Sequence, residues 1–399
     1  MPDHVDETRR TTLEQCPDCN YDGLRGIKDH VNYAVELPPI RPLIICYEWQ
    51  SGYCPCCRKR KRSRHPEQPS WAQGAAMVAL GPGALALAAT LKIRHAVAFR
   101  RVAELFVVVF GLQFTAGALA QALQRLGDRM DDTYQALILA LQVSHAVFVD
   151  ETGWRVLRVL TWLWVFTNKD VTVYVIDTRK GHEVPLGILG ASYAGVIHHD
   201  GARAYDSLPF LQHQTCLEHI LRDLDELVET KTRGAVRWPG AVAELLRDAI
   251  ALRSRHGVQP SGAAATPKDR AGRIEQRLDR LLVADLTDPD NQRMQRRLER
   301  NRDQLFPFLY IEQVEATTAR AEQQIRPMVA NRKNGACNRT WAGARATQIL
   351  GSVVATARQR GHNPYEVLME AASRPKGHVI ERLIPPKPNV PAEDARPPP

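Results

Sequence analysis

The sequence has few of the features that mark a secreted or membrane-bound protein. Of its eight cysteines only two lie beyond residue 57, so the pattern does not indicate a disulfide scaffold of the secreted kind. Residues 1–15 are polar and contain no apolar run of the kind found in signal peptides. Ala72–Thr90 is the only uncharged stretch long enough to span a bilayer, and Gly81-Pro82-Gly83 breaks it in the middle. We therefore expect two buried helices in this stretch and no membrane partner.

The composition is that of an ordinary globular protein with a basic balance. Hydrophobic residues make up 44% and charged residues 24% of the 399 residues, and this length suits two or three domains with their own cores. The chain has 53 Lys and Arg against 44 Asp and Glu, a net charge of +9. A basic excess favours a polyanionic partner, although ribosomal and membrane-surface proteins share it.

The residue pattern changes along the chain and divides it into six segments. They are a cysteine-rich and then basic segment (1–65), a helical region (66–143), a strand-rich region (144–223), an arginine-rich helical region (224–305), a region with further helices (306–372) and a proline-rich tail (373–399). Short β-branched and aromatic runs after Ser144 predict three adjacent strands, a helical stretch around Pro185–Leu189 and a fourth strand that ends at Asp200. Helical spacing of apolar residues predicts two more helices at 319–335 and 341–359.

Four of the N-terminal cysteines form two C-x-x-C pairs, Cys16 with Cys19 and Cys54 with Cys57. Two thiolates at this spacing can bind one side of a tetrahedral zinc ion, and a second pair completes the site. So small a segment has little core, and a structural zinc would supply much of its folding energy. Cys46 and Cys56 are alternative ligands, and the competing interpretation is a set of reduced cysteines without metal.

Directly after the second cysteine pair follows the run RKRKRSRH, residues 58–65. Each phosphate contact by such side chains releases a counterion, which gives a sequence-independent affinity for DNA. We interpret the run as a clamp on the DNA backbone rather than as a merely solvated stretch. The residues assigned to the clamp are Arg58, Lys59, Arg60, Lys61 and Arg62.

A second candidate DNA-binding element lies at Phe99–Leu126. An apolar helix is predicted to end at Gly111, and Thr115 has the position of an N-cap for a second helix. A helix, a short turn with glycine and a capped helix form the outline of a helix-turn-helix. Any helical hairpin gives the same pattern, so a structural role is the alternative.

Two of the predicted strands end in an aspartate, VFVD at Asp150 and VIHHD at Asp200. Because the ends of neighbouring strands lie close together, two such carboxylates can share metal ions. A lone aspartate at a strand end is more often a turn former, and the matching context of these two favours a joint site. Successive strand residues face opposite sides, so Glu151 cannot point into the same site as Asp150 and is expected to make a local hydrogen bond.

Five blocks of the sequence are, in order, FVDETGWRV, LWVF, GVIHHDGARAY, CLEHILRDL and AEQQIRPMVANRKNG. In this order they resemble the transposases of the insertion sequence 66 family. The cysteine pairs are similar to the zinc-binding segment of that family, and GARATQILGSVVATARQRGHNPYEVL is similar to its C-terminal portion. The resemblance covers residues 14–372 and implies an α/β fold, namely an RNase H-like mixed sheet core interrupted by a helical insertion, with an N-terminal zinc ribbon. It also implies a DDE catalytic triad and DNA transposition.

The family motif assigns the three catalytic acids to Asp150, Asp200 and Glu322, the last in the block RAEQQIRP. In the family an Asn-Asn pair usually precedes the glutamate and an Arg follows it, whereas this chain has Thr318-Ala319 and Gln323. The departure leaves two interpretations open: an active DDE transposase, or a catalytically impaired relic that acts only as a DNA-binding protein. A hydrolase that uses the two aspartates as an acid–base pair would leave the cysteine pairs and the arginine-rich helices unexplained.

The resemblance implies cofactors and partners as well. Three carboxylates would hold two Mg (or Mn) ions, of which one activates the attacking oxygen and the other stabilises the leaving oxygen. One structural Zn ion would bind the cysteines. The partners implied are DNA, both as terminal inverted repeats and as target, further copies of the chain in a homo-oligomer on that DNA, and accessory proteins of the same element. The expected location is the bacterial cytoplasm, at the nucleoid.

Five further residues are candidates for the same site. Cys216 and His219 lie three apart on a predicted helix, where they either support the catalytic acids or belong to a packed helix face. Arg326, Arg332 and Lys333 closely follow the third acid, and they either bind DNA phosphates or form a solvated face.

Overall fold

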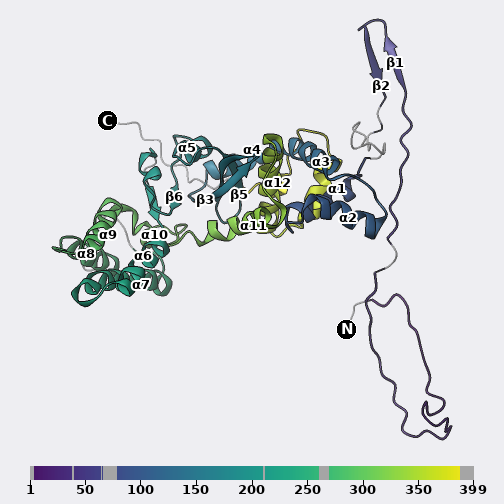
Figure 1. Ribbon diagram of the computed structural model, residues 1–399, viewed down its shortest axis with the longest axis horizontal. Coiled ribbons are helices and arrows are strands. Elements are labelled where there is room, and N and C mark those ends of the chain that lie inside the picture. Colours follow the sequence, from purple (N-terminus) through teal and green to yellow (C-terminus); the bar gives the residue numbers. More distant parts are fainter. Residues whose placement is uncertain are drawn as a thin grey trace. The chain divides into compact units, whose positions relative to one another are not determined.

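The computed structural model describes residues 4–37, 40–63, 65, 79–209, 212–259 and 269–386. By its internal contacts the chain forms two units, Met1–Leu43 and Ile44–Pro399. Within residues 4–37 and 40–43 the first unit has turns and bends but no helix or strand. The sheet and the helices belong to the second unit (Figure 1).

A five-stranded mixed sheet forms the core of the second unit, in the order β5-β4-β3-β6-β7. Its strands are β3 (Ala146–Val156), β4 (Val159–Thr167), β5 (Thr172–Asp177), β6 (Val196–His199) and β7 (Gln212–Thr215). β3, β4 and β5 are antiparallel neighbours, whereas β6 runs parallel to β3 and β7 parallel to β6. The helix α5 (Glu183–Leu189) connects β5 to β6. The three predicted strands, the helical stretch and the fourth strand are thereby confirmed, and β7 is an additional strand.

The two faces of the sheet belong to different hydrophobic clusters, because successive residues of β3 point to opposite sides. Val147 and Val149 belong to the large hydrophobic cluster, whereas Phe148 and Trp154 belong to a smaller one with side chains of α11 (Ala319–Gly335). The helices of the large cluster, besides α5, are α1 (Pro82–Ile93), α2 (Phe99–Phe110), α3 (Ala116–Arg129), α4 (Asp131–Gln142), α12 (Trp341–Gln359) and α13 (Pro364–Ser373). α11 and α12 have the bounds that the sequence predicts.

The outer edge of β5 is covered by α12. Backbone N–H groups of β5 donate to side chains of α12 at 2.8–3.1 Å, from Thr172 to Thr356, from Tyr174 to Ser352 and from Ile176 to Gln348. Four residues of a helix rise about 6 Å and two residues of a strand about 6.6 Å, so the two repeats match over this length. Helix side chains therefore satisfy strand donors that would otherwise be open to pairing with another strand.

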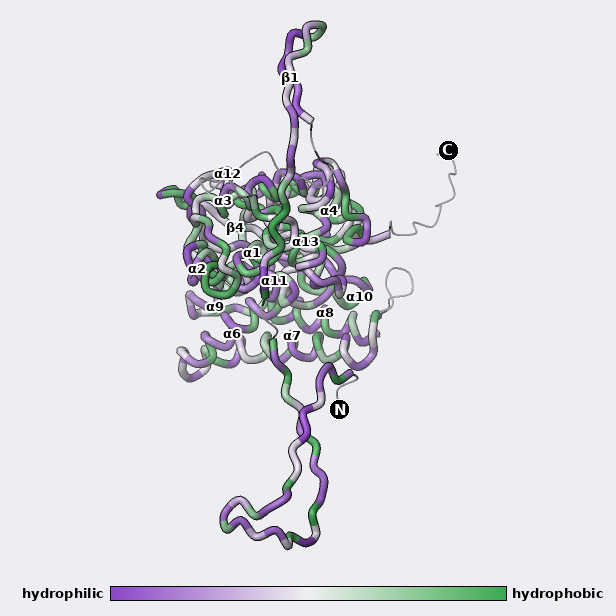
Figure 2. The backbone as a smooth tube through the Cα atoms, turned by 90° about the vertical axis from the view of Figure 1, so that its right-hand side faces the viewer, coloured by the Kyte–Doolittle hydropathy of each residue, from purple (hydrophilic) through white to green (hydrophobic). Residues whose placement is uncertain are grey.

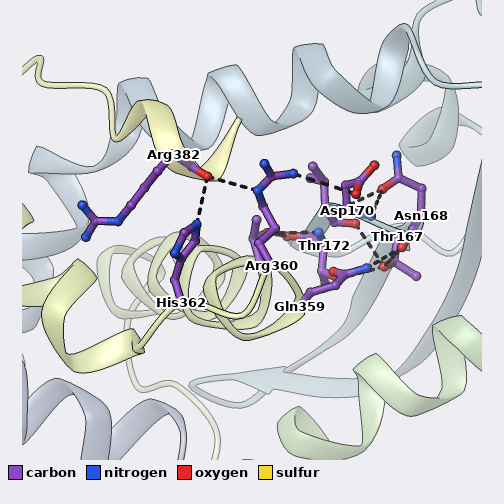
Figure 3. Close-up of polar contacts among 10 residues, drawn as sticks. Thr167, Asn168, Asp170, Thr172, Gln359, Arg360, His362 and Arg382 are labelled. Carbon is purple, nitrogen blue, oxygen red and sulfur yellow. Dashed lines mark hydrogen bonds and ion pairs between the residues drawn. The ribbon is translucent and has the colours of Figure 1, made fainter. Parts of the chain in front are cut away.

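The turn between β4 and β5 is fastened to the C-terminal end of α12 (Figure 3). The hydroxyl of Thr172 donates to Oε1 of Gln359 at 2.8 Å. The next residue, Arg360, pairs with Asp170 in the turn at 3.8 Å and donates from Nε to the carbonyl oxygen of Arg382 at 3.1 Å (Figure 3). These contacts hold the segment after α13 against the sheet.

The helices between β7 and α11 form a cluster with its own core. They are α6 (Leu217–Thr230), α7 (Arg237–His256), α8 (Arg270–Leu282), α9 (Pro289–Arg300) and α10 (Pro307–Tyr310). Hydrophobic and hydrophilic residues alternate along α6, α7 and α8 in Figure 2, as expected for helices that bury one side. The N–H of Leu217 donates to the carbonyl oxygen of Ala316 at 2.9 Å, so the cluster leaves and rejoins the core at one place. Short 3-10 helices lie at Arg203–Ser207, Arg233–Val236, Arg302–Gln304 and Glu381–Leu383.

The two helices predicted for the helix-turn-helix are α2 and α3, and the motif itself stays a prediction. Gly111 ends α2 in the left-handed conformation, with φ at +66°. The hydroxyl of Thr115 accepts a hydrogen bond from the N–H of Ala118 at 3.1 Å and so caps α3. The geometry is that of a capped helical hairpin, and DNA binding by it stays a prediction.

The basic run folds as a strand that the sequence did not predict. β1 (Ser51–Cys54) and β2 (Lys59–Arg62) form an antiparallel hairpin, in which Cys54 ends β1 and Cys57 lies in the turn. All side chains of β2 are exposed.

The stretch considered for a membrane span is only partly described. Residues 66–78 lie outside the described part of the chain, and α1 begins at Pro82, where the break was predicted. Among the described residues, no helix combines the length and the apolar character needed to cross a bilayer.

Candidate active site

Asp150 and Asp200 occupy matching positions on the two parallel strands β3 and β6. The register places Phe148 opposite His198, and each aspartate follows two residues later on its own chain. β6 ends at His199, one residue before the predicted end at Asp200. The prediction that a strand also ends at Asp150 is wrong: β3 continues to Val156, because it stays paired with β4 beyond the point where its pairing with β6 stops.

The alternation along β3 sends the two neighbouring acids to opposite faces. Asp150 shares the face of Phe148, against which α11 packs, and Glu151 shares the opposite face. A carboxylate oxygen of Glu151 accepts a hydrogen bond from the hydroxyl of Tyr205 at 3.1 Å, and the other pairs with Nζ of Lys180 at 3.4 Å. The local hydrogen bond expected for Glu151 is therefore wrong, because its partners come from other elements.

The Asp150 carboxyl lies in an environment that disfavours its charge. Its pKa is raised to about 7, mainly by burial and to a smaller extent by the charges of Glu151 and Glu322. The N–H of Glu151 donates to Oδ1 of Asp150 at 2.9 Å and acts in the opposite direction. Burial, followed by the charge of Asp200, likewise raises the pKa of Glu151. Several carboxylates therefore act on one another at this place on the sheet.

Hydrogen bonds connect the end of β6 to the helix that contains Glu322. The N–H of Cys216 donates to the carbonyl oxygen of His199 at 2.8 Å, next to Asp200. The N–H of Thr318 donates to the sulfur of Cys216 at 3.2 Å, and the N–H of Glu322 donates to the carbonyl oxygen of Thr318 at 3.1 Å. Thr318 is the N-cap residue of α11 and is buried. The second and third predicted acids are thus joined through Cys216.

The Cys216–His219 pair lies at the start of α6, with Cys216 as its N-cap residue. Burial acts to raise the pKa of the Cys216 thiol, but interactions with His219 and Thr318 outweigh it and lower that pKa. The interaction with Cys216 raises the pKa of His219, to which the charge of Asp200 adds a smaller contribution. The pair therefore belongs to the surroundings of the acids.

Arginines of α9 hold the turn after Asp200. Nη2 of Arg297 donates to the carbonyl oxygen of Asp200 at 3.3 Å, and Nη2 of Arg300 to that of Gly201 at 3.1 Å. Gly201 has a φ of +80°, and a Cβ there would lie 2.8 Å from Cγ2 of Thr215, so this position requires glycine. The sequence showed that the helical region is rich in arginine but did not indicate which of its residues reach the site.

Buried histidines surround the same strand end and were not singled out from the sequence. The ring of His198 stacks on Phe148 with 4.0 Å between centroids, and its nitrogens have no hydrogen-bond partner within the described residues. Burial lowers its pKa to about 3, so this imidazole is neutral. Nε2 of His199 lies 3.1 Å from Nδ1 of His213, and burial lowers the pKa of His199 as well. A neutral imidazole next to Asp200 adds no positive charge to offset the carboxylates.

The three basic residues after Glu322 differ in their surroundings. Arg326 and Lys333 are exposed on α11. Arg332 donates to Oγ1 of Thr152 at 3.2 Å and to the carbonyl oxygen of Gly153, so it joins α11 to β3. Across the described parts of the chain, no three His, Cys, Asp or Glu side chains lie close enough together to hold one metal ion.

Each cysteine pair forms a tight turn. The N–H of Asn20 donates to the carbonyl oxygen of Cys16 at 2.9 Å, and Cys54 and Cys57 enclose the turn between β1 and β2. Hydrogen bonds from backbone groups lower the pKa of the Cys16 and Cys54 thiols. Cys16 and Cys19 belong to the first unit and the other pair to the second. The four-cysteine zinc site remains a prediction.

The mixed sheet and its acidic site define an α/β protein with acidic residues at matching positions on the parallel strands β3 and β6. A family model described as Transposase IS66 family matches residues 77–346, which include all three predicted acids. The chain belongs to this transposase family, and a role in DNA transposition, with DNA as its partner, follows from that membership. A comparison with curated proteins gives no match.

Proposed function

We propose that the chain cleaves DNA at the ends of its element and joins those ends to target DNA, using Asp150, Asp200 and Glu322. The observation that carries the proposal is the matching register of the two aspartates on β3 and β6, combined with the influence of Glu322 on the pKa of Asp150. In the first reaction water attacks the phosphorus and the 3′ oxygen leaves, which exposes a 3′-hydroxyl at the element's end. In the second, that hydroxyl attacks a phosphorus of the target, and a target 3′ oxygen leaves.

The order of the strands supports an RNase H-like core. Three antiparallel strands followed by two parallel ones, in the order β5-β4-β3-β6-β7, place the first acid on the central strand and the second after its neighbour. The third acid comes from a helix packed on one face, after a helical insertion. An RNase H-like core of this kind would let acids from three separate regions of the chain act in one site.

The donor set fits hard divalent cations. Carboxylate oxygens are the preferred ligands of Mg and Mn. Like charges repel, so carboxylates with raised pKa values gain from a cation that lies among them. Two Mg ions bound there would activate the attacking oxygen and stabilise the leaving one. Arg326 and Lys333, exposed on the helix of the third acid, are placed to contact DNA phosphates.

The experiment uses purified full-length chain and a labelled duplex carrying the end of the DNA element that encodes it. With Mg present we expect cleavage and joined products, and Asp200→Ala is expected to abolish both. The matched control is Asp248→Ala, since Asp248 lies in the helical insertion in a surface ion pair with Arg277 at 2.9 Å. Undiminished turnover by Asp200→Ala would overturn the proposal.

The same experiment separates the active enzyme from an impaired relic. Thr318, Ala319 and Gln323 differ from the family pattern around the third acid. A protein that binds the end duplex but gives no product with Mg or Mn would be such a relic. Restoring the family residues at all three positions would then be expected to restore cleavage.

A further inference from the structure

The turn between β3 and β4 exposes large apolar side chains. We call residues Arg155–Leu160 the hairpin tip. Leu157 is 70% exposed, Leu160 59% and Val159 48%. Three neighbouring large apolar side chains at the tip of a hairpin are unusual, because turns are normally polar. Their exposure needs a reason outside the packing of the sheet.

The backbone of the hairpin tip is strained as well. Val156 pairs with Val159, so Leu157 and Arg158 are the two central residues of a two-residue turn. Leu157 has a φ of +57°, at a position that favours glycine, and a bulky side chain there costs about 1 kcal/mol or more. The cost is not offset by burial of the side chain. Strain and apolar exposure at one residue point to contact with another molecule.

The hairpin tip is held rigidly despite its exposure. The N–H of Leu157 donates to the carbonyl oxygen of Asn338 at 2.8 Å, and Nε1 of Trp154 donates to Oδ1 of the same residue at 2.9 Å. The side-chain amide of Asn338 donates in turn to Oγ1 of Thr347 on α12 at 2.8 Å. Trp341, three residues after Asn338, is 49% exposed. The tip and the start of α12 thus form one fixed projection.

The charge of this projection is positive. Arg155, Arg158 and Arg339 are exposed, and neither residues 155–160 nor residues 338–342 include an acidic residue. Apolar side chains flanked by arginines are the means by which many proteins enter the minor groove, separate stacked base pairs and bend the duplex. On the basis of the proposed function, we propose that the hairpin tip inserts Leu157 between base pairs of the element's end and distorts the duplex near the cleaved phosphate.

The position of the distortion follows from the length of β3. The strand runs without interruption from Asp150 to Val156, so the tip lies about 20 Å from the first acid at about 3.3 Å per residue. Duplex DNA rises about 3.4 Å per base pair, so this distance corresponds to about six base pairs. The base step that Leu157 opens is therefore about six base pairs from the phosphate that is cleaved.

The test replaces Leu157 by asparagine, which tolerates positive φ but cannot wedge between bases. The probe is the end duplex with 2-aminopurine placed at successive steps around the predicted position. Wild type is expected to raise the fluorescence there, and Leu157→Asn to abolish that rise and slow cleavage of the paired duplex about tenfold or more. A duplex with a mismatch at the same step should restore cleavage by the variant.

The matched control is Val283→Asn, the same kind of change at a side chain that is 84% exposed at the end of α8. It should leave fluorescence and cleavage unchanged. Neither variant should lower the midpoint of thermal unfolding, and relief of the strain at residue 157 is expected to raise that of Leu157→Asn slightly. If wild type cleaves the duplex and Leu157→Asn gives the same fluorescence and the same cleavage rate, insertion of Leu157 is overturned while the proposed function stands. Failure of wild type on every DNA would instead overturn the proposed function.

Two other outcomes would also overturn the proposal. A lower unfolding midpoint for Leu157→Asn than for Val283→Asn would show that Leu157 packs against the protein. In the second outcome, sedimentation shows an oligomer for wild type that Leu157→Asn does not form, and the mismatch does not restore cleavage by the variant. This result would show that the hairpin tip contacts another copy of the chain.

Discussion

The backbone N–H of Thr318 donates a hydrogen bond to the sulfur of Cys216, at 3.2 Å, although the two residues lie 102 positions apart in the sequence. Both residues are buried, with exposed fractions of 2% for Thr318 and 1% for Cys216. The bond fixes the start of α11 against the end of the sheet where Asp200 lies. We therefore expect the thiol to position Glu322 without touching it.

Removal of the sulfur acceptor is expected to weaken both stability and cleavage. Cys216→Val has a similar volume but leaves the Thr318 N–H buried without a partner, at a cost of about 1–3 kcal/mol. Cys216→Ser keeps an acceptor and should stay within about 1 kcal/mol of wild type. Chemical denaturation measures the first effect. Single-turnover cleavage and Mn binding measure the effect on the site. An equal loss of cleavage in Cys216→Val and Cys216→Ser would refute a positioning role.

Replacement of Asp150 by asparagine is expected to stabilise the protein at alkaline pH when divalent cations are removed. Because the folded pKa is raised from 3.8 to about 7, the unfolded state loses its proton first and wild-type stability falls as the pH rises between these values. The free energy of unfolding of Asp150→Asn should thus exceed that of wild type by at most about 4 kcal/mol near pH 8, and the difference should vanish near pH 4. Denaturation in EDTA across this range is the measurement.

Added Mg provides the control for that experiment. A cation held by the carboxylate stabilises wild type and not the variant, so the order of the two midpoints should reverse with Mg at about pH 8. A variant less stable than wild type in EDTA would contradict the unfavourable charge assigned to Asp150.

Lys92 is expected to make the stability of the fold rise at high pH. Its side chain is buried, Nζ donates to Oδ1 of Asn331 at 2.7 Å, and burial lowers the Lys92 pKa from 10.5 to about 8. The folded state loses its proton first, so stability increases as the pH rises from about 8 to about 10.5, by about 3 kcal/mol. The difference between wild type and Lys92→Met should show this slope. A constant difference would mean that Lys92 keeps its ordinary pKa.

The basic strand is expected to contribute to DNA affinity without regard to sequence. Replacing residues 58–62 by glutamine should reduce the slope of log K against log salt by up to about 4.5, since each phosphate contact contributes about 0.9. The loss should be equal on the end duplex and on an unrelated duplex, because phosphate contacts contain no base information. A loss confined to the end duplex would assign base contacts to this strand.

The strands and helices that the sequence predicted have strong local patterns. α11 and α12 begin and end where the apolar spacing and the turn between them indicate, and Thr115 caps α3 as its position suggests. The sequence predicted an end of β3 at Asp150 that is too early. Buried and less buried side chains still alternate at Trp154 and Val156, but the small and polar residues before them hide this pattern in the sequence. A local pattern therefore predicts the type of an element better than its end.

The features that the sequence missed depend on partners distant along the chain. β7 is polar, and its Gln214 is satisfied by the carbonyl oxygen of Leu305 and the N–H of Phe308. The carboxylate of Glu151 depends in the same way on Tyr205. Their positions at the ends of predicted strands indicated the two aspartates, whereas Glu322 needed the family motif, because a glutamate in the first turn of a helix is common.

The hydrogen bond between Leu217 and Ala316 makes the helical cluster a closed loop on the core. Each doubling of such a loop adds only about 0.6 kcal/mol of closure entropy, so its length has little effect on the stability of the sheet. The segment between these residues can accordingly gain or lose helices during evolution, or be exchanged for a reader of different DNA, while the acids keep their register. Arg297 and Arg300 restrict such changes, since any segment that replaces the helical cluster must also supply hydrogen-bond donors to the carbonyl oxygens of the turn at Asp200.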